Sequence, residues 1–134
     1  MIPWAVRYYR DRRGRLPVAD FFALPSVIGI TEVEHVKFRA RLELVRQHGL
    51  GLIARDSDVL EPMKGETNLY AVRLRGTTNN PRVFACALSR HRCVVLLHAF
   101  KELRPGAYRR ELPLARTRRA RVAADPARWV GDAS

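Results

Sequence analysis

The sequence has no long hydrophobic run, and this shortage excludes a protein that crosses a membrane by helices. No apolar run approaches the ~20 residues that a membrane-crossing helix needs. In residues 1–13 the charge follows a short strand-like run and no apolar segment comes after it, unlike the order in a secretory signal peptide. We therefore expect a cytoplasmic protein with no membrane partner.

Cysteine is scarce as well. The chain has only two, Cys86 and Cys93, which are too few to form a zinc site by themselves. If Ser89 and Arg90 form a tight turn, the two cysteines face each other across neighbouring strands. In a reducing cytoplasm we expect both to be thiols that fill space in the interior.

The common catalytic and metal-binding motifs are also missing. The chain contains no P-loop, no GxGxxG, no HExxH and no nucleophile elbow. His35, His48 and His91 are scattered and have no partners at metal-ligand spacing. The sequence therefore predicts neither a metal nor a small-molecule cofactor.

Acidic residues are few, and the resulting positive charge is the strongest global feature. Lys and Arg number 25 against 13 Asp and Glu, which gives a formal net charge of +12. Such a chain attracts polyanions, of which nucleic acid is the most common in a cytoplasm. Arginine far outnumbers lysine and suits bidentate phosphate contacts. A soluble basic surface without function, or an acidic protein partner, would explain the charge as well.

The hydrophobic pattern predicts a single α+β domain over residues 1–124. With 134 residues, 47% of them hydrophobic, the chain can bury a core without disulfides or metals. We expect one antiparallel sheet of about four to five strands, with two N-terminal helices packed on it. The strand-like patterns cover residues 2–11, 58–65, 68–76, 82–88 and 93–100.

Two helices are expected before the second strand. The first lies within residues 16–25, where Pro17 suits a first helical turn. In the second, Thr31 and Glu34 form a capping box, and Gly49 marks the end. The apolar stripe of this second helix is expected to comprise Val36, Phe38, Ala40, Leu42, Leu44 and Val45.

The C-terminal part is basic. Residues 105–125 are expected to be partly helical and interrupted by Pro113, and residues 125–134 to form a loosely held tail. The basic side chains are either a solvated helix face or a surface that grips ribosomal RNA in a salt-dependent way. They are Arg109, Arg110, Arg116, Arg118, Arg119 and Arg121.

Four short motifs, in a fixed order, carry a family resemblance. They are a Lys-Gly step, a Leu-Tyr-x-x-Arg strand, an Arg-Val-aromatic strand and a Leu-Leu-His-x-Phe-Lys strand, formed by Lys64, Gly65, Leu69, Tyr70, Arg73, Arg82, Val83, Phe84, Leu96, Leu97, His98, Phe100 and Lys101. In these motifs, and in the order of elements from residue 4 to residue 122, the chain resembles the RelE/HigB superfamily of toxins. It is most similar to the phage-derived Gp49-like branch. Two departures are the long loop at residues 75–82 and Glu102, where many relatives carry a lysine.

The resemblance implies a RelE-like fold with a C-terminal helical segment. It also implies the toxin of a type II toxin–antitoxin module, an endoribonuclease that cleaves mRNA in the ribosomal A site. The expected partners are the ribosome with its mRNA and a cognate antitoxin, typically a helix-turn-helix protein. The resemblance also implies cleavage without a metal, by attack of the ribose 2′-hydroxyl on the phosphate.

The candidate catalytic residues are Arg73, Arg82, His98 and Lys101. By resemblance the two arginines contact the scissile phosphate, and Lys101 supplies charge or a proton. His98 either serves as acid or base or is a hydrogen-bonded core residue. If the loop between the last two strands has an even number of residues, Arg82 and Lys101 share a face of the sheet; an odd number places His98 on the face of Arg82.

Further residues are candidates for RNA binding rather than chemistry. By family position, Lys64 and Tyr108 are expected to contact the message. Phe100 either stacks on a base or fills the core. Arg109 and Arg110 belong to the basic run that follows the last strand.

Two other functions remain open. A sister branch of the same fold, the ParE-like toxins, poisons DNA gyrase and tends to lack the phosphate-binding basic set that Arg73, Arg82 and Lys101 provide here. A second alternative is a non-catalytic remnant that only binds its antitoxin or RNA.

Overall fold

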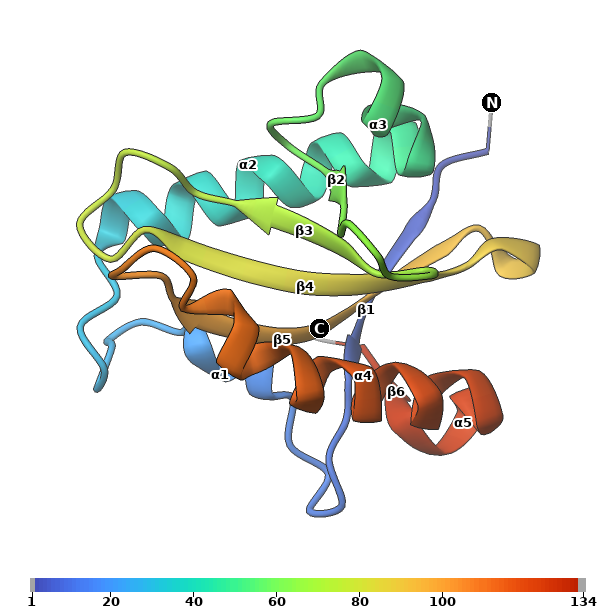
Figure 1. Ribbon diagram of the computed structural model, residues 1–134. Helices are drawn as coiled ribbons and strands as arrows, with labels where there is room; N and C mark the ends of the chain where they lie inside the picture. The colour runs from blue at the N-terminus through green and yellow to red at the C-terminus, as the bar shows by residue number, and fades with distance from the viewer. Residues whose placement is uncertain (1, 133–134) are drawn as a thin grey trace.

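The structure is a computed structural model that describes residues 2–132. It is a mixed α+β arrangement of one sheet with helices on both faces (Figure 1). The elements in chain order are β1 (Ala5–Tyr9), α1 (Pro17–Phe21), α2 (Glu32–His48), η1 (Gly49–Gly51), α3 (Leu52–Arg55), β2 (Glu61–Pro62), β3 (Tyr70–Arg73), β4 (Pro81–Leu88), η2 (Ser89–His91), β5 (Cys93–Lys101), α4 (Tyr108–Ala124), α5 (Pro126–Trp129) and β6 (Val130–Gly131).

The sheet is mixed, so the expectation of a purely antiparallel sheet of four to five strands is wrong. Its six strands have the order β2-β3-β4-β5-β1-β6. β1 pairs with β5 in parallel, while the other pairs are antiparallel. A parallel pair needs a long crossover connection, and the helices and strands between β1 and β5 provide it. The additional strands are short: β2 and β6 have two residues each and lie at the two edges.

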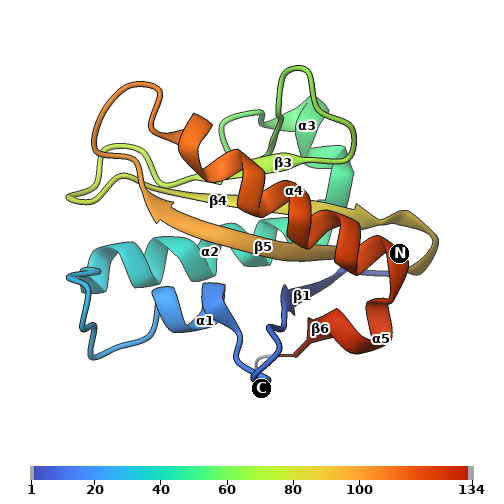
Figure 2. The same cartoon turned by 60° about the horizontal axis from the view of Figure 1, so that its bottom comes forward.

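The two faces of the sheet carry separate hydrophobic cores. α1 and α2 cover one face and α4 covers the other, as the two views show (Figures 1 and 2). On the first face Phe22 and Phe38 stack with ring centroids 3.8 Å apart, which joins α1 to α2. On the second face Ala115 and Val122 of α4 are fully buried against the sheet. Burying apolar surface on both faces is the main stabilisation of this fold.

The ends of α2 confirm the sequence prediction. Thr31 and Glu34 form the reciprocal capping box, and Gly49 is the residue that ends the helix. Gly49 has φ +53°, and a Cβ there would collide with the ring of Trp4, so the position requires glycine.

The predicted stripe of α2 is only partly correct. Phe38, Leu42 and Val45 are buried, but Val36 and Ala40 are exposed. Leu44 is partly buried against the core. Glu34 takes a place in the buried face instead, because its carboxylate receives hydrogen bonds from the loop between β3 and β4. Hydrophobicity alone could not predict a buried carboxylate with partners far along the chain.

The C-terminal part is more ordered than expected. α4 runs through Pro113 without interruption, although proline lacks a backbone N–H, and the helix packs on the sheet through Ala115 and Val122. Residues 126–131 are not loosely held: Trp129 is buried and stacks on Tyr9 with centroids 5.9 Å apart, and β6 pairs with β1. Among the described residues no helix is long and apolar enough to span a membrane.

The hairpin between β4 and β5 does not place the cysteines opposite each other. Its loop spans residues 89–92, so Cys93 pairs with Leu88 and Cys86 pairs with Val95. Both cysteines are buried free thiols. Burial raises the pKa of Cys86 to about 12, which keeps this thiol protonated and unreactive.

Candidate active site

A β-bulge in β5 decides which side chains share a face of the sheet. The loop 89–92 has four residues, an even number, and on that basis Arg82 would share a face with Lys101. The register shifts by one residue between Phe84 and Ala85, however, because β5 carries one extra residue at this point. Arg82 therefore pairs with Phe100, and Phe84 pairs with His98, on the face that α4 covers.

Arg73 and Arg82 lie side by side and share one carboxylate. They are directly paired across β3 and β4. Arg73 donates through Nη2 to Oε1 of Glu102 at 2.8 Å, and Nη2 of Arg82 lies 3.0 Å from the same oxygen. Nη1 of Arg73 lies 3.4 Å from Oε1 of Glu61 in β2. The two guanidinium groups thus form one cationic centre at the end of the sheet.

Arg82 is unusual because it is a buried arginine with an unused donor. Only 4% of the residue is exposed. Its guanidinium carbon lies 4.8 Å from the ring centroid of Tyr108, at the start of α4. Its Nε is buried and has no hydrogen-bond partner within the described residues. A buried donor without a partner is costly, and Nε2 of His98 is the other buried side-chain atom without a partner among the described residues.

These side chains line an open hollow of about 480 Å³. The strand residues form its floor, and the connection from β5 to α4 forms its rim. Its lining comprises Arg73, Asn80, Arg82, Glu102, Leu103, Arg104, Pro105, Gly106 and Tyr108. The hollow is large enough for a phosphodiester with part of a nucleotide, and its cations suit that charge.

His98 lies on the same face but does not line the hollow. Its ring stacks beside Phe100 with centroids 5.8 Å apart, and its Nε2 lies 3.6 Å from Oε1 of Glu111 in α4. Burial lowers the pKa of His98, and Glu111 only partly offsets this effect. His98 is therefore a partly buried residue beside Phe100, which agrees with a core position but not with a hydrogen-bonded one, because its Nε2 has no hydrogen-bond partner among the described residues.

Lys101 is separated from the arginines by the sheet itself. Because Phe100 points to the α4 face, its neighbour Lys101 points to the face of α1 and α2. There Nζ of Lys101 donates to the carbonyl oxygen of Ile28. The structure thus brings Arg73 and Arg82 together and leaves Lys101 outside their hollow.

The predicted RNA-binding residues fall into three environments. Phe100 is buried beside Phe84 and fills the core, which is the second of the two roles considered for it. Lys64 is exposed in the turn after β2 and does not line the hollow. Tyr108 does line it, while Arg109 and Arg110 are exposed in the first turn of α4 next to it.

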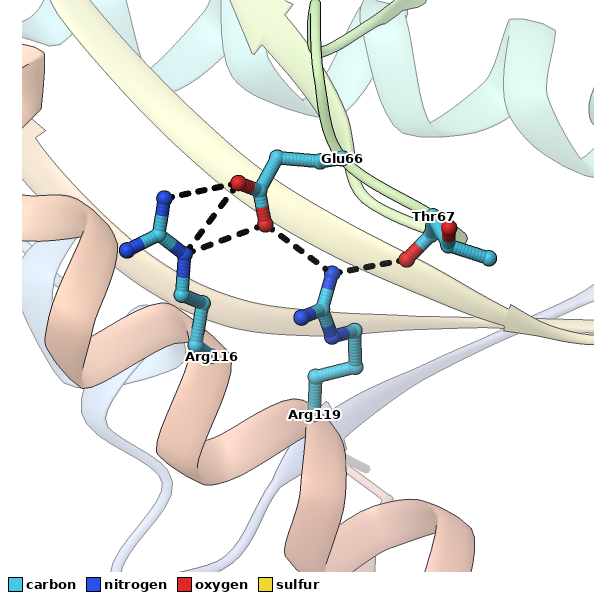
Figure 3. Close-up of polar contacts among 4 residues, drawn as sticks. All are labelled: Glu66, Thr67, Arg116 and Arg119. Atoms are coloured by element: carbon cyan, nitrogen blue, oxygen red, sulfur yellow. Dashed lines mark hydrogen bonds and ion pairs between the residues drawn. The ribbon is translucent and has the colours of Figure 1, made fainter.

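Most of the other arginines of α4 are engaged within the protein. Arg116 and Arg119 both bind the carboxylate of Glu66, with shortest distances of 2.7 and 3.2 Å, and Arg119 also donates to the carbonyl of Thr67 (Figure 3). Arg118 donates to the carbonyl of Leu97. These contacts fix α4 against the sheet and leave fewer charges for a partner than the sequence suggests.

A second hollow, of about 570 Å³, lies elsewhere. It lies between α1 and α2, and its lining includes the apolar side chains of Phe22, Phe38 and Leu42. His35 at its wall contacts the carbonyl of Phe22 through Nδ1, at 2.7 Å. It contains none of the predicted site residues, so its size alone does not make it the active site.

The sequence analysis missed Glu102 and Asn80 as members of the site. Asn80 donates through Nδ2 to the carbonyl of Glu102 at 3.1 Å, and the backbone N–H of Glu102 donates to the carbonyl of Asn80 at 3.3 Å. The sequence did contain a sign of Glu102: an acidic residue comes directly after Lys101, the residue that ends the strand motif. For Asn80 there was no signal, since it lies in the long loop.

Comparison with known protein families identifies the one to which this chain belongs. The model of the family described as Phage derived protein Gp49-like (DUF891) matches residues 24–120. The chain therefore belongs to this phage-derived Gp49-like family, and membership agrees in coarse terms with a toxin that has an antitoxin partner. No curated protein and no solved structure gives a significant match.

Proposed function

We propose that this protein is the toxin of a type II toxin–antitoxin module and cleaves mRNA on the ribosome. The observation that carries the proposal is the convergence of Arg73 and Arg82 on one hollow, with the Nε donor of Arg82 buried and unused. Membership of the Gp49-like family and the resemblance to RelE/HigB toxins support it.

The chemistry needs cations aimed at one phosphate. When the 2′-hydroxyl attacks, negative charge grows on the non-bridging oxygens of the phosphorane. Arg73 and Arg82 stabilise this charge, and because the site is already organised they do so without rearrangement. Tyr108 covers the guanidinium of Arg82 and limits the access of water to it. The reaction yields a 2′,3′-cyclic phosphate and a free 5′-hydroxyl.

The hollow is shallow and open, which suits a substrate held by something else. A ribosome that positions the message would supply the alignment that this small protein lacks. The antitoxin, by the same proposal, is a small helix-turn-helix protein that silences the toxin until it is degraded. Purified protein alone is therefore expected to cut naked RNA very slowly.

The test is expression of three chains from a tight promoter in a bacterial host, followed within minutes by mapping of mRNA 5′ ends. The chains are the wild type, Arg73→Ala and the control Arg90→Ala, whose exposed arginine lies in η2 outside the hollow. The proposal expects new ends within coding regions for wild type and control, and none for Arg73→Ala.

The same experiment separates the alternatives. Growth arrest with DNA breaks and without new mRNA ends would mean a gyrase poison of the ParE-like kind. No arrest, with an intact fold by circular dichroism, would mean a remnant that only binds antitoxin or RNA. The arginine pair supports the nuclease over the gyrase poison, because two cations converge on one hollow that would suit a phosphate. The mapping of mRNA ends separates the nuclease from a remnant that only binds RNA.

A further inference from the structure

We propose that Glu102 is the general base of the reaction and takes the proton of the attacking 2′-hydroxyl. The inference rests on the proposed ribonuclease function and adds a catalytic residue to it. Glu102 is the only carboxylate among the residues that line the hollow. It shares this hollow with the two arginines that would hold the scissile phosphate.

The two oxygens of the Glu102 carboxylate have different surroundings. Oε1 is held by Arg73 and lies next to Arg82, whereas Oε2 has no hydrogen-bond partner in the described part of the chain. The first oxygen fixes the group, and the second is left for a substrate hydroxyl. A carboxylate oxygen beside a phosphate site is within reach of the adjacent ribose when the phosphate contacts the same arginines.

The backbone of Glu102 is also fixed. Asn80 binds it on both sides, through the side-chain amide to the carbonyl of Glu102 and through its own carbonyl to the N–H. These two hydrogen bonds hold the main chain of Glu102, while the salt bridges to Arg73 and Arg82 hold its side chain. The geometry favours a group that stays in place while the phosphate binds beside it.

The surroundings of Glu102 favour proton uptake by its carboxylate. Burial raises the pKa of Glu102 above its ordinary value, Arg73 opposes this, and Glu61 adds to it. A base with a raised pKa accepts a proton more readily. The charged groups that face Glu102 are Arg73, Arg75, Arg82 and Glu61, with Arg104 on the rim of the hollow.

The proton balance is as follows. One oxygen of Glu102 takes the proton from the 2′-hydroxyl as the O2′–P bond forms. The P–O5′ bond breaks, and the leaving 5′-oxygen takes a proton from water. The carboxyl group of Glu102 then loses its proton to solvent, where it neutralises the hydroxide. His98, which does not line the hollow, takes no part in this transfer.

The test is single-turnover cleavage of a message on programmed ribosomes by wild type, Glu102→Gln and Glu102→Asp, over about pH 5.5 to pH 8. Glutamine keeps the shape but cannot accept a proton. We expect Glu102→Gln to be at least about 100-fold slower and to lose the rise of rate with pH, with partial recovery in Glu102→Asp. Binding of inorganic phosphate, measured by calorimetry, is expected to be as tight or tighter in Glu102→Gln.

Three outcomes would overturn the assignment. Glu102→Gln that cleaves within about threefold of wild type would show that no proton is transferred there. Faster cleavage by Glu102→Gln would show that Glu102 obstructs the anion site. Slow cleavage with lost phosphate binding would show that Glu102 only positions the arginines. If the wild type itself produced no cuts on ribosomes, the proposed function would fail first, and the inference with it.

Discussion

At the scale of single residues, burial of Arg82 is best explained by function. Long charged side chains are almost never fully buried unless they are paired, and Arg82 is paired only in part: Nη2 meets Glu102, while Nε has no partner among the described residues. A buried ion pair often stabilises a fold less than apolar residues of similar volume would. On the proposed function, anion binding would account for a pair that packing alone does not favour.

Replacement of the pair by neutral residues is predicted to separate stability from binding. In the double variant Arg82→Met with Glu102→Gln, the free energy of unfolding is expected to stay within about 1 kcal/mol of wild type, or to rise. Phosphate binding is expected to be lost. Chemical denaturation and calorimetry on one preparation measure both. A loss of stability beyond about 3 kcal/mol would assign the pair a structural role instead.

Glu34 is predicted to make the protein sensitive to acid. Burial alone would raise the pKa of Glu34, but hydrogen bonds from Thr31 and Asn79 outweigh it and lower the pKa from 4.5 to about 2. A carboxyl with a lowered folded-state pKa stabilises the fold above its unfolded pKa. This stability disappears as the pH falls from about 4.5 toward 2.

The variant Glu34→Gln tests this directly. At neutral pH its free energy of unfolding is expected to be lower by roughly 1.5–3 kcal/mol, because hydrogen bonds to a charged acceptor are replaced by weaker ones. Its stability should change less than that of wild type between pH 5 and about pH 3. Equal slopes against pH for both chains would show that other carboxyls govern acid unfolding.

At the scale of elements, the local signals were predictable and the long-range ones were not. The capping box at Thr31 and the end of α2 at Gly49 depend on residues close in the chain, so the sequence predicts them correctly. The parallel pairing of β1 with β5 depends on residues about 90 positions apart, and strand patterns carry no direction. β6 has two residues, too few for any pattern.

The candidate site also has features that the sequence predicts and features that it does not. The arginine pair of β3 and β4 follows from the family motifs, but the face on which it lies depends on one bulge. Counting the loop between β4 and β5 predicts the wrong partner for Arg82, because the extra residue in β5 reverses the alternation after Leu96. That shift removes Lys101 from the site and brings in Glu102 just after the strand, a residue that the sequence marked only as a departure from the family.

The attachment of α4 to the sheet is predicted to depend on Glu66. Arg116 and Arg119 lower the pKa of this carboxyl, and its side chain is only 10% exposed (Figure 3). Glu66→Gln is expected to reduce the free energy of unfolding by about 1 kcal/mol at neutral pH, and less in high salt. The measurement is urea denaturation at two salt concentrations, with amide hydrogen exchange in α4.

A matched control is Glu43→Gln. Glu43 pairs with Arg46 on the surface of α2, at 3.2 Å and with both side chains about half exposed. Such a pair contributes at most about 0.5 kcal/mol. If the two variants lost equal stability, the two-arginine contact of Glu66 would have no special role in holding α4.

At the scale of the whole molecule, the net charge of +12 does not show which cations a nucleic acid can reach. Arg73 and Arg82 face Glu102, and Arg116 and Arg119 face Glu66, so part of the positive charge is balanced inside the protein. The remaining charge determines approach to a polyanion, and its position on the surface matters more than its sum. The exposed Arg109 and Arg110 lie beside the hollow and the exposed Arg104 lines it, so these three are well placed.

The last prediction therefore compares two variants of equal charge. Arg109→Ala with Arg110→Ala removes two arginines beside the hollow, and Arg12→Ala with Arg13→Ala removes two exposed ones from the turn after β1. Each lost phosphate contact lowers the slope of log K against log salt by about 0.7 for a single strand. We expect the first variant to bind a short single-stranded RNA more weakly at low salt, with a slope smaller by about 1.4, and the second to match wild type. Fluorescence anisotropy across a salt series measures both slopes. Equal losses in the two variants would mean that RNA responds only to total charge, and the surface around Arg109 would then have no particular role in approach to the site.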